Sequence, residues 1–138
     1  MYSYEDIYDF LSEELSVSRD ALSPNTDIHV EFGFYGDDAF DFEDKFADKF
    51  SVDISGYLWY FHHKEEGQNT GGILFKPPNE RVEHIAVTPQ ILLDSANTGK
   101  WSIEYPDHTV PKYRYDMLFN LLLTAIFVIV LILVFVYG

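Results

Sequence analysis

The carboxylates between residues 37 and 48 form the densest group of side chains that could do chemistry in this chain. They are Asp37, Asp38, Asp41, Glu43, Asp44 and Asp48. Carboxylate oxygens can hold a divalent cation, but this spacing does not match a calcium loop of the Asp-x-Asp-x-Asp-Gly type. Clustered charges of one sign also attract a basic protein surface. We therefore expect these residues to dock a basic partner, and we expect no bound metal.

The histidines offer no regular metal-binding spacing. His62 and His63 are adjacent, so their side chains point apart on either a helix or a strand. The other histidines are scattered, no His-x-x-x-His spacing occurs, and the chain has no cysteine. Zinc sites are built from several His or Cys side chains at short spacings. The lack of cysteine also excludes disulfides.

The sequence contains no motif that is typical of nucleophilic catalysis. No Gly-x-Ser-x-Gly turn and no phosphate-binding loop occurs. Asp94 and Ser95 form an Asp-Ser pair, but it falls late in a predicted helix. We therefore expect that the protein is not an enzyme and carries no cofactor.

The acidic cluster must be presented by a helix, and the apolar residues within it set the helix bounds. Gly36 is unfavourable within a helix and marks a break before it. Asp37 and Asp38 follow directly, and carboxylates in the first turn stabilise a helix because they complement its dipole. The pattern predicts a helix over residues 37–50. Its apolar face recurs at helical spacing at Ala39, Phe42, Phe46 and Phe50. The side chains predicted to be exposed beside that face are Asp41, Glu43, Asp44 and Asp48.

Two further helices flank this one in the sequence. Ser3 can cap a helix over residues 3–16, whose apolar residues fall on one face. Thr88 caps another, with Pro89 at its first position and Gly99 at its end. We expect a mainly α fold, a small helical bundle. Residues 57–63 remain open between a short helix and a strand that pairs with residues 72–76 as a hairpin, and residues 82–87 are strand-like.

Residues 117–137 form an uncharged, strongly apolar run in which Asn120 and Thr124 are the clearly polar residues. A helix of this length spans roughly 30 Å, the thickness of the hydrocarbon core of a bilayer. We expect a C-terminal transmembrane helix. The predicted organisation is a cytoplasmic domain over residues 1–106, a tether over residues 107–116 and the membrane helix.

The residues flanking this run predict its orientation. Lys112 and Arg114 precede it and nothing basic follows it, which favours a cytoplasmic N-terminal side. Tyr113, Tyr115 and Tyr137 bracket the run, as aromatic side chains do at membrane interfaces. We expect a single-pass, tail-anchored protein of the inner membrane.

The charge balance narrows the choice of partners. The net charge is −14, and 14 acidic residues lie in residues 1–50 against Arg19, Lys45 and Lys49. Such a surface repels nucleic acid, because the phosphate backbone is itself anionic. We therefore expect a basic protein partner, such as a membrane protein, and no nucleic acid.

Residues 31–37, which lead into the predicted acidic helix, resemble the entry to the second helix of acyl carrier proteins. In that family an Asp-Leu-Gly-x-Asp-Ser-Leu stretch opens the helix, and its serine carries phosphopantetheine. Residues 50–54 resemble the segment that follows that helix. The serine position is occupied here by Gly36, which has no side-chain oxygen, so the resemblance implies a carrier-like bundle that cannot take the prosthetic group.

The chain is more similar to a bacterial domain-of-unknown-function family with an acyl-carrier-like core. Three elements carry the resemblance: Gly-Asp-Asp-Ala at residues 36–39, Phe-x-Val-Asp-x-Ser-Gly at residues 50–56, and Gly-x-Trp at residues 99–101. The resemblance as a whole covers about residues 3–101. The resemblance implies an interaction module that docks a basic partner through its acidic second helix.

Two alternatives for the function remain open at the level of sequence. The protein could be a working acyl carrier that uses another serine. It could also be a small subunit or inhibitor of an integral membrane complex. In that case Asn120 and Thr124, four residues apart on one helix face, could form hydrogen bonds to other membrane helices.

Overall fold

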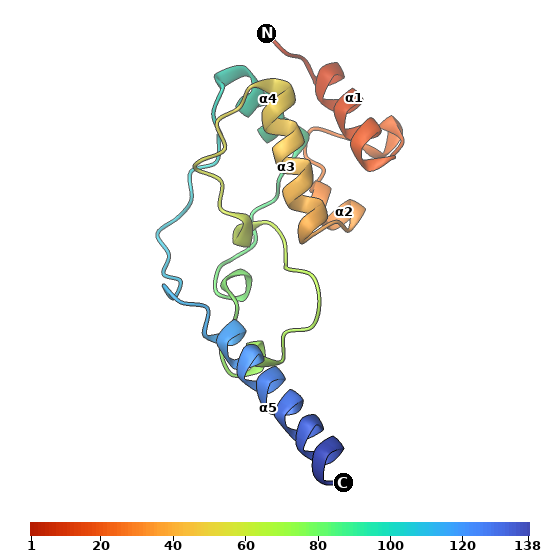
Figure 1. The fold of residues 1–138 in the computed structure, drawn as a ribbon. Coiled ribbons are helices and arrows are strands. Elements are labelled where there is room, and N and C mark those ends of the chain that lie inside the picture. Colours follow the sequence, from red (N-terminus) through yellow and green to blue (C-terminus); the bar gives the residue numbers. More distant parts are fainter. The chain divides into compact units, whose positions relative to one another are not determined.

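The computed structural model describes residues 1–138 and is mainly helical, with no β-strand (Figure 1). This confirms the predicted fold class. The chain forms two compact units. Unit 1 comprises residues 1–66 and 83–107, and unit 2 comprises residues 67–82 and 108–138.

Unit 1 contains four α-helices and two short 3₁₀ turns. The α-helices are α1 (Tyr4–Leu15), α2 (Ile28–Phe32), α3 (Asp37–Phe50) and α4 (Pro89–Thr98), and the 3₁₀ turns are η1 (Arg19–Ala21) and η2 (Trp59–Phe61). The predicted first, acidic and proline-started helices are therefore confirmed. Helix α2 was not predicted, because it is only one turn long. Asp27 caps its start and Gly33 ends it in the left-handed conformation.

The start of α3 requires glycine at position 36. Gly36 has φ 60° and ψ −135°, and a Cβ atom there would collide with the side chain of Glu66. Its N–H donates to the carbonyl of Lys64 at 3.0 Å, and its own carbonyl accepts from Phe40 at 3.1 Å. Both the backbone angles and the space therefore exclude a side chain.

The core of unit 1 joins the apolar faces of α1, α3 and α4. Helices α1 and α4 pack against each other. Phe10 of α1 lies between Phe42, Phe46 and Phe50 of α3, with ring centroids 5.3, 6.0 and 5.5 Å away. The other buried core residues are Ile7, Leu11, Ile28, Val52, Val87, Leu92, Ala96 and Trp101. The phenylalanine stripe predicted for α3 therefore faces the core, as its spacing required.

Of the two alternatives left open for residues 57–63 the short helix is confirmed, whereas the strand predicted for residues 82–87 is wrong. Residues 57–63 contain the 3₁₀ turn η2 and do not pair with residues 72–76, and residues 82–87 are extended but join no sheet. The single β-bridge joins Asp53 and Lys100, where Asp53 donates to Gly99 and accepts from Trp101, each at 2.9 Å. Aromatic side chains in residues 57–63 pack against Phe40 of α3 and against Trp101 and Tyr105, so a strand partner is not needed to bury them.

Unit 2 contains one long helix, α5 (Tyr115–Tyr137), and the 3₁₀ turns η3 (Thr70–Ile73) and η4 (Pro78–Glu80). Turn η3 packs against α5. Helix α5 is long and apolar enough to cross a membrane, and its apolar stretch is not buried by the rest of the protein.

Candidate functional site

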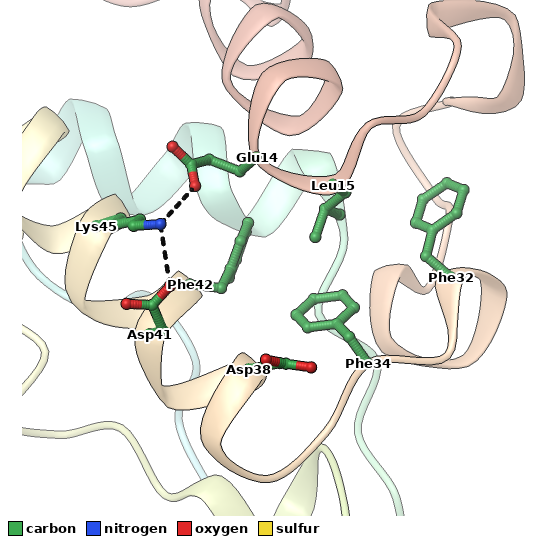
Figure 2. A pocket seen from close by; sticks show the side chains of 8 residues that line it. All are labelled: Glu14, Leu15, Phe32, Phe34, Asp38, Asp41, Phe42 and Lys45. Carbon is green, nitrogen blue, oxygen red and sulfur yellow. Dashed lines mark ion pairs between the residues drawn. The ribbon is translucent and has the colours of Figure 1, made fainter.

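A pocket of about 230 Å³ opens beside the N-terminal half of α3 (Figure 2). Residues from the end of α1, from α2 and from the following loop complete it. Its lining residues are Glu14, Leu15, Phe32, Phe34, Asp38, Asp41, Phe42 and Lys45. Figure 2 shows Glu14, Lys45 and Asp41 gathered on one side, with Leu15 and the rings of Phe32 and Phe34 on the other. The pocket thus combines an apolar side with a charged side.

The charged side of the pocket is predominantly negative. The ammonium of Lys45 lies 3.0 Å from Asp41 and 3.2 Å from Glu14, and these two carboxylates raise the pKa of Lys45. Exposed ion pairs of this kind contribute little to folding stability. Their effect here is to neutralise Lys45, the one cation of the lining, while Asp38 adds a further carboxylate. A cationic ligand would therefore be attracted to this side.

The apolar side of the pocket is fixed by His29. The His29 ring stacks against Phe34 with centroids 4.3 Å apart, and Nδ1 of His29 donates to the carbonyl of Phe34 at 3.2 Å. Phe34 in turn meets Phe42 edge-on at 5.2 Å. His29, which belongs to no motif in the sequence, therefore positions the wall of the pocket.

The predicted exposure of Glu43 is wrong. Its side chain is 2% exposed, and Oε1 lies 3.5 Å from Nε2 of His29. Position 43 is one turn beyond Ala39 and one turn before Phe46, which places it on the buried face of α3. Burial raises the pKa of Glu43, opposed by His29 and by the hydroxyl of Tyr57.

Nε2 of His29 and Oε1 of Glu43 face each other without forming a hydrogen bond. Because the Phe34 carbonyl can only accept, Nδ1 of His29 carries a hydrogen, and Nε2 is the ring nitrogen directed towards Glu43. At 3.5 Å the contact is longer than an ordinary hydrogen bond, and neither atom has another partner. The pair is sealed from the pocket, so it supports the fold rather than reacting with a ligand.

The other carboxylates of the cluster are exposed on α3, as predicted. They are Asp37, Asp38, Asp41, Asp44 and Asp48. Asp38 and Asp41 line the pocket, and Asp37 and Asp38 lie in the first turn of the helix. The sequence signal that separates Glu43 from these residues is its spacing from Ala39 and Phe46. Their role in binding a partner stays a prediction.

His62 and His63 are both buried in unit 1. Nδ1 of His62 pairs with the carbonyl of Ile85, and Nε2 pairs with the hydroxyl of Tyr105, each at 2.7 Å. Nδ1 of His63 pairs with the carbonyl of Lys64 at 2.9 Å. No group of three or more His, Asp or Glu side chains is arranged to hold a metal ion. The two histidines therefore join loops to the core.

The surroundings of Ser95 indicate a structural role for its side chain. It is buried in α4, its hydroxyl donates to the hydroxyl of Ser102, and it accepts from the backbone N–H of Ser102, both at 3.1 Å. This side chain fastens the segment after α4 to the helix. It is not presented at a helix entry where a modifying enzyme could reach it.

The predicted membrane-interface residues lie at the two ends of α5 in unit 2. Lys112 lies over the ring of Tyr113 at 5.5 Å, and Arg114 donates twice to Asp116, at 2.9 and 2.6 Å. Tyr115 begins the helix and Tyr137 ends it. The helix starts two residues before the predicted run, because Tyr115 and Asp116 extend its first turn.

Comparison with known proteins yields one family and no closer relative. Searches of curated proteins and of solved structures find no significant match. The family model described as "Protein of unknown function (DUF1493)" matches residues 4–104, which include the pocket, all of α1 to α4 and the Glu43–His29 pair. The chain belongs to the DUF1493 family.

Proposed function

We propose that this protein is a membrane-tethered interaction module that docks a basic partner through α3 and its pocket, in a binding rather than a catalytic role. The observation that carries the proposal is the composition of the pocket. Three carboxylates and one neutralised lysine line a space of about 230 Å³ together with Leu15 and three phenylalanines. A basic peptide segment with an apolar side chain has the matching chemistry.

The exposed carboxylates beyond the pocket support the same partner. Asp44 and Asp48 continue the negative surface along α3, and residues 1–50 hold most of the acidic side chains of the chain. Opposite charges steer a partner into contact and fix its orientation, while apolar burial supplies affinity. The acidic helix selects the partner, and the pocket anchors it.

The anchor in this proposal is α5. Its length and composition suit a membrane span, and Lys112 and Arg114 at its start favour a cytoplasmic position for unit 1 at an inner membrane. In this proposal the acidic helix lies on the cytoplasmic side, where a basic partner associated with the membrane would meet it.

We also propose that unit 1 is a carrier-like bundle that has lost its prosthetic group. The support is local: Gly36 stands at the entry of α3, and both its backbone angles and Glu66 oppose a side chain there. The alternative of a carrier using another serine predicts a phosphopantetheine adduct in the intact mass after incubation with a phosphopantetheinyl transferase. An unmodified mass supports the interaction module.

A membrane-complex subunit held by polar contacts of α5 is less well supported. The amide of Asn120 is bonded within unit 2, donating to Asn69 and accepting from Gly71, and the hydroxyl of Thr124 donates to the carbonyl of Asn120. These groups are therefore already satisfied without another helix.

Crosslinking from membranes tests the docking proposal. The full-length protein is compared with the double reversal Asp44→Lys and Asp48→Lys, and with the control reversal Asp20→Lys and Glu104→Lys, which changes the net charge equally at exposed positions away from α3. We expect the α3 reversal to abolish capture of a partner and the control to retain it. Equal capture by both variants would place the contact elsewhere.

Salt dependence adds a second arm to this experiment. Exposed charges act through a screened field, so high salt should weaken capture by the wild type as the α3 reversal does. If the partner is still captured at high salt and by the α3 reversal, the exposed face of α3 takes no part in binding.

A further inference from the structure

Unit 2 exposes three consecutive apolar side chains outside α5. Ile73, Leu74 and Phe75 follow one another at the end of η3 and are 82%, 64% and 41% exposed. A run of large apolar side chains in water is unfavourable, and such a patch marks an interaction surface. We call residues 70–76 the apolar loop.

The apolar loop is fastened to the first turns of α5. The N–H of Gly71 donates to Oδ1 of Asn120 at 2.7 Å, and a Cβ atom at Gly71 would collide with the backbone carbonyl of Asp116. The ring of Phe75 lies 5.9 Å from Tyr115 and 6.4 Å from Phe119. The loop therefore lies beside the first turns of α5, at the start of its apolar run.

The polar groups at this junction satisfy one another. Asn69 donates to Asp116 at 2.7 Å, and Asn120 donates to Asn69 at 2.8 Å. Gly72 donates to Asn69 at 3.0 Å, and the carbonyl of Gly71 accepts from Leu74 and Phe75. Non-helical backbone is tolerated at membrane depth only where its hydrogen bonds are made within the protein. This junction meets that condition.

The charge of unit 2 is opposite to that of unit 1. Unit 2 carries Glu80 and Asp116 against four basic residues, which are Lys76, Arg81, Lys112 and Arg114. Lys76 is the last residue of the apolar loop, and Arg81 donates to the carbonyl of Lys76 at 2.7 Å. Basic side chains beside an apolar segment are attracted to anionic lipid headgroups. A bilayer thus matches both the apolar and the basic parts of this surface.

We propose that the apolar loop is a second membrane contact, in which Ile73, Leu74 and Phe75 insert into the leaflet that receives the N-terminal end of α5. The inference rests on the proposed membrane span. Its occupant is the lipid bilayer itself, since the exposed loop is continuous with the apolar surface of α5. The loop and the helix together fix the depth of α5 and limit its rotation.

Fluorescence quenching in proteoliposomes tests the loop. Because the chain has no cysteine, the full-length variants Leu74→Cys, Leu122→Cys and Asn25→Cys each take one environment-sensitive dye. Leu122 lies within α5 and is the membrane reference, and Asn25 is exposed in unit 1 and is the aqueous reference. The vesicles contain phosphatidylcholine with a minority of phosphatidylglycerol, with or without a lipid that carries a quencher near its headgroup.

We expect the dye at position 74 to be quenched by the lipid-borne quencher and protected from iodide, whereas the dye at position 25 shows the reverse. If the dye at 122 is quenched by lipid while the dye at 74 behaves like that at 25, the loop proposal is wrong and the anchor stands. If the dye at 122 also escapes the lipid quencher, the anchor is wrong and the loop proposal falls with it.

Discussion

Glu43 of α3 lies with its carboxylate 3.5 Å from Nε2 of His29, both side chains being 2% exposed. The pair stands directly behind the pocket, because His29 also stacks on Phe34 and bonds to its carbonyl. Glu43 resembles its exposed acidic neighbours in sequence. It nevertheless lies in the protein interior, where it supports the wall of the candidate binding site.

The first prediction concerns the pH dependence that Glu43 contributes. Burial raises its pKa in the folded state above the ordinary 4.5. Its contribution is therefore fully present below pH 4.5 and is lost as pH rises through the raised value. Glu43→Gln keeps a neutral side chain of the same shape, so near neutral pH the variant should be more stable than the wild type.

Urea unfolding of the full chain in detergent, measured at several pH values, checks this. The stability gained by Glu43→Gln should shrink as the pH falls towards 4.5. The control is the neutralising substitution Asp44→Asn, which removes the same charge at the adjacent, exposed position. A variant that is less stable than the wild type at neutral pH would contradict the raised pKa of Glu43.

The second prediction concerns His62, whose protonation state is fixed by its neighbours. The hydroxyl oxygen of Tyr105 accepts from Trp101 at 2.9 Å and from the N–H of Leu58 at 3.2 Å, so its hydrogen points to Nε2 of His62. Nε2 must therefore be unprotonated. Burial accordingly lowers the pKa of His62 from 6.5 to about 4.

Folding stability from neutral His62 is present above pH 6.5 and is lost as the pH falls towards about 4, because the unfolded chain takes up the proton first. The full loss is about 3 kcal/mol at most. His62→Gln, which does not titrate, should show a flatter acid limb in urea unfolding. The exposed His108→Gln should keep the wild-type slope, and an unchanged slope in His62→Gln would contradict the assignment.

The third prediction concerns the entry of α3. Gly36→Ser forces a side chain into a positive-φ conformation and against Glu66, at a cost of about 2 kcal/mol. Gly56→Ser, at a position with open space and no positive φ, should be nearly neutral. Thermal unfolding measures both variants. Equal stability of the two would remove the steric argument for glycine at position 36.

The fourth prediction concerns α5. Deleting residues 117–138 removes the apolar run that suits a bilayer, so the truncated protein should leave the membrane fraction, while the full chain should resist carbonate extraction. Residues 1–116 lose no part of the unit 1 core. A truncated protein that still pellets after a carbonate wash would show that another segment provides the attachment.

Local sequence patterns determined the elements that depend on neighbouring residues. The bounds of α3 follow from Gly36 and from the spacing of Ala39, Phe42, Phe46 and Phe50, and they are as predicted. The capping of α4 by Thr88 and its termination at Gly99 are equally local. These features could be predicted because helix starts, stops and apolar periodicity are encoded within a few turns.

Tertiary structure decided the features that depend on distant residues. The burial of Glu43 needs α2 to bring His29 against α3, and the apolar loop needs Gly71 to meet Asn120 across 49 positions of sequence. The choice between helix and strand for residues 57–63, and the failure of the strand predicted for residues 82–87, have the same cause, since an apolar segment without periodicity takes its conformation from whatever it packs against. The sequence alone determined α1, α3 and α4, the acidic surface and the apolar C-terminal run. Only long-range packing decided which carboxylate is buried and which loop accompanies α5, because burial is a property of contacts and not of residue type.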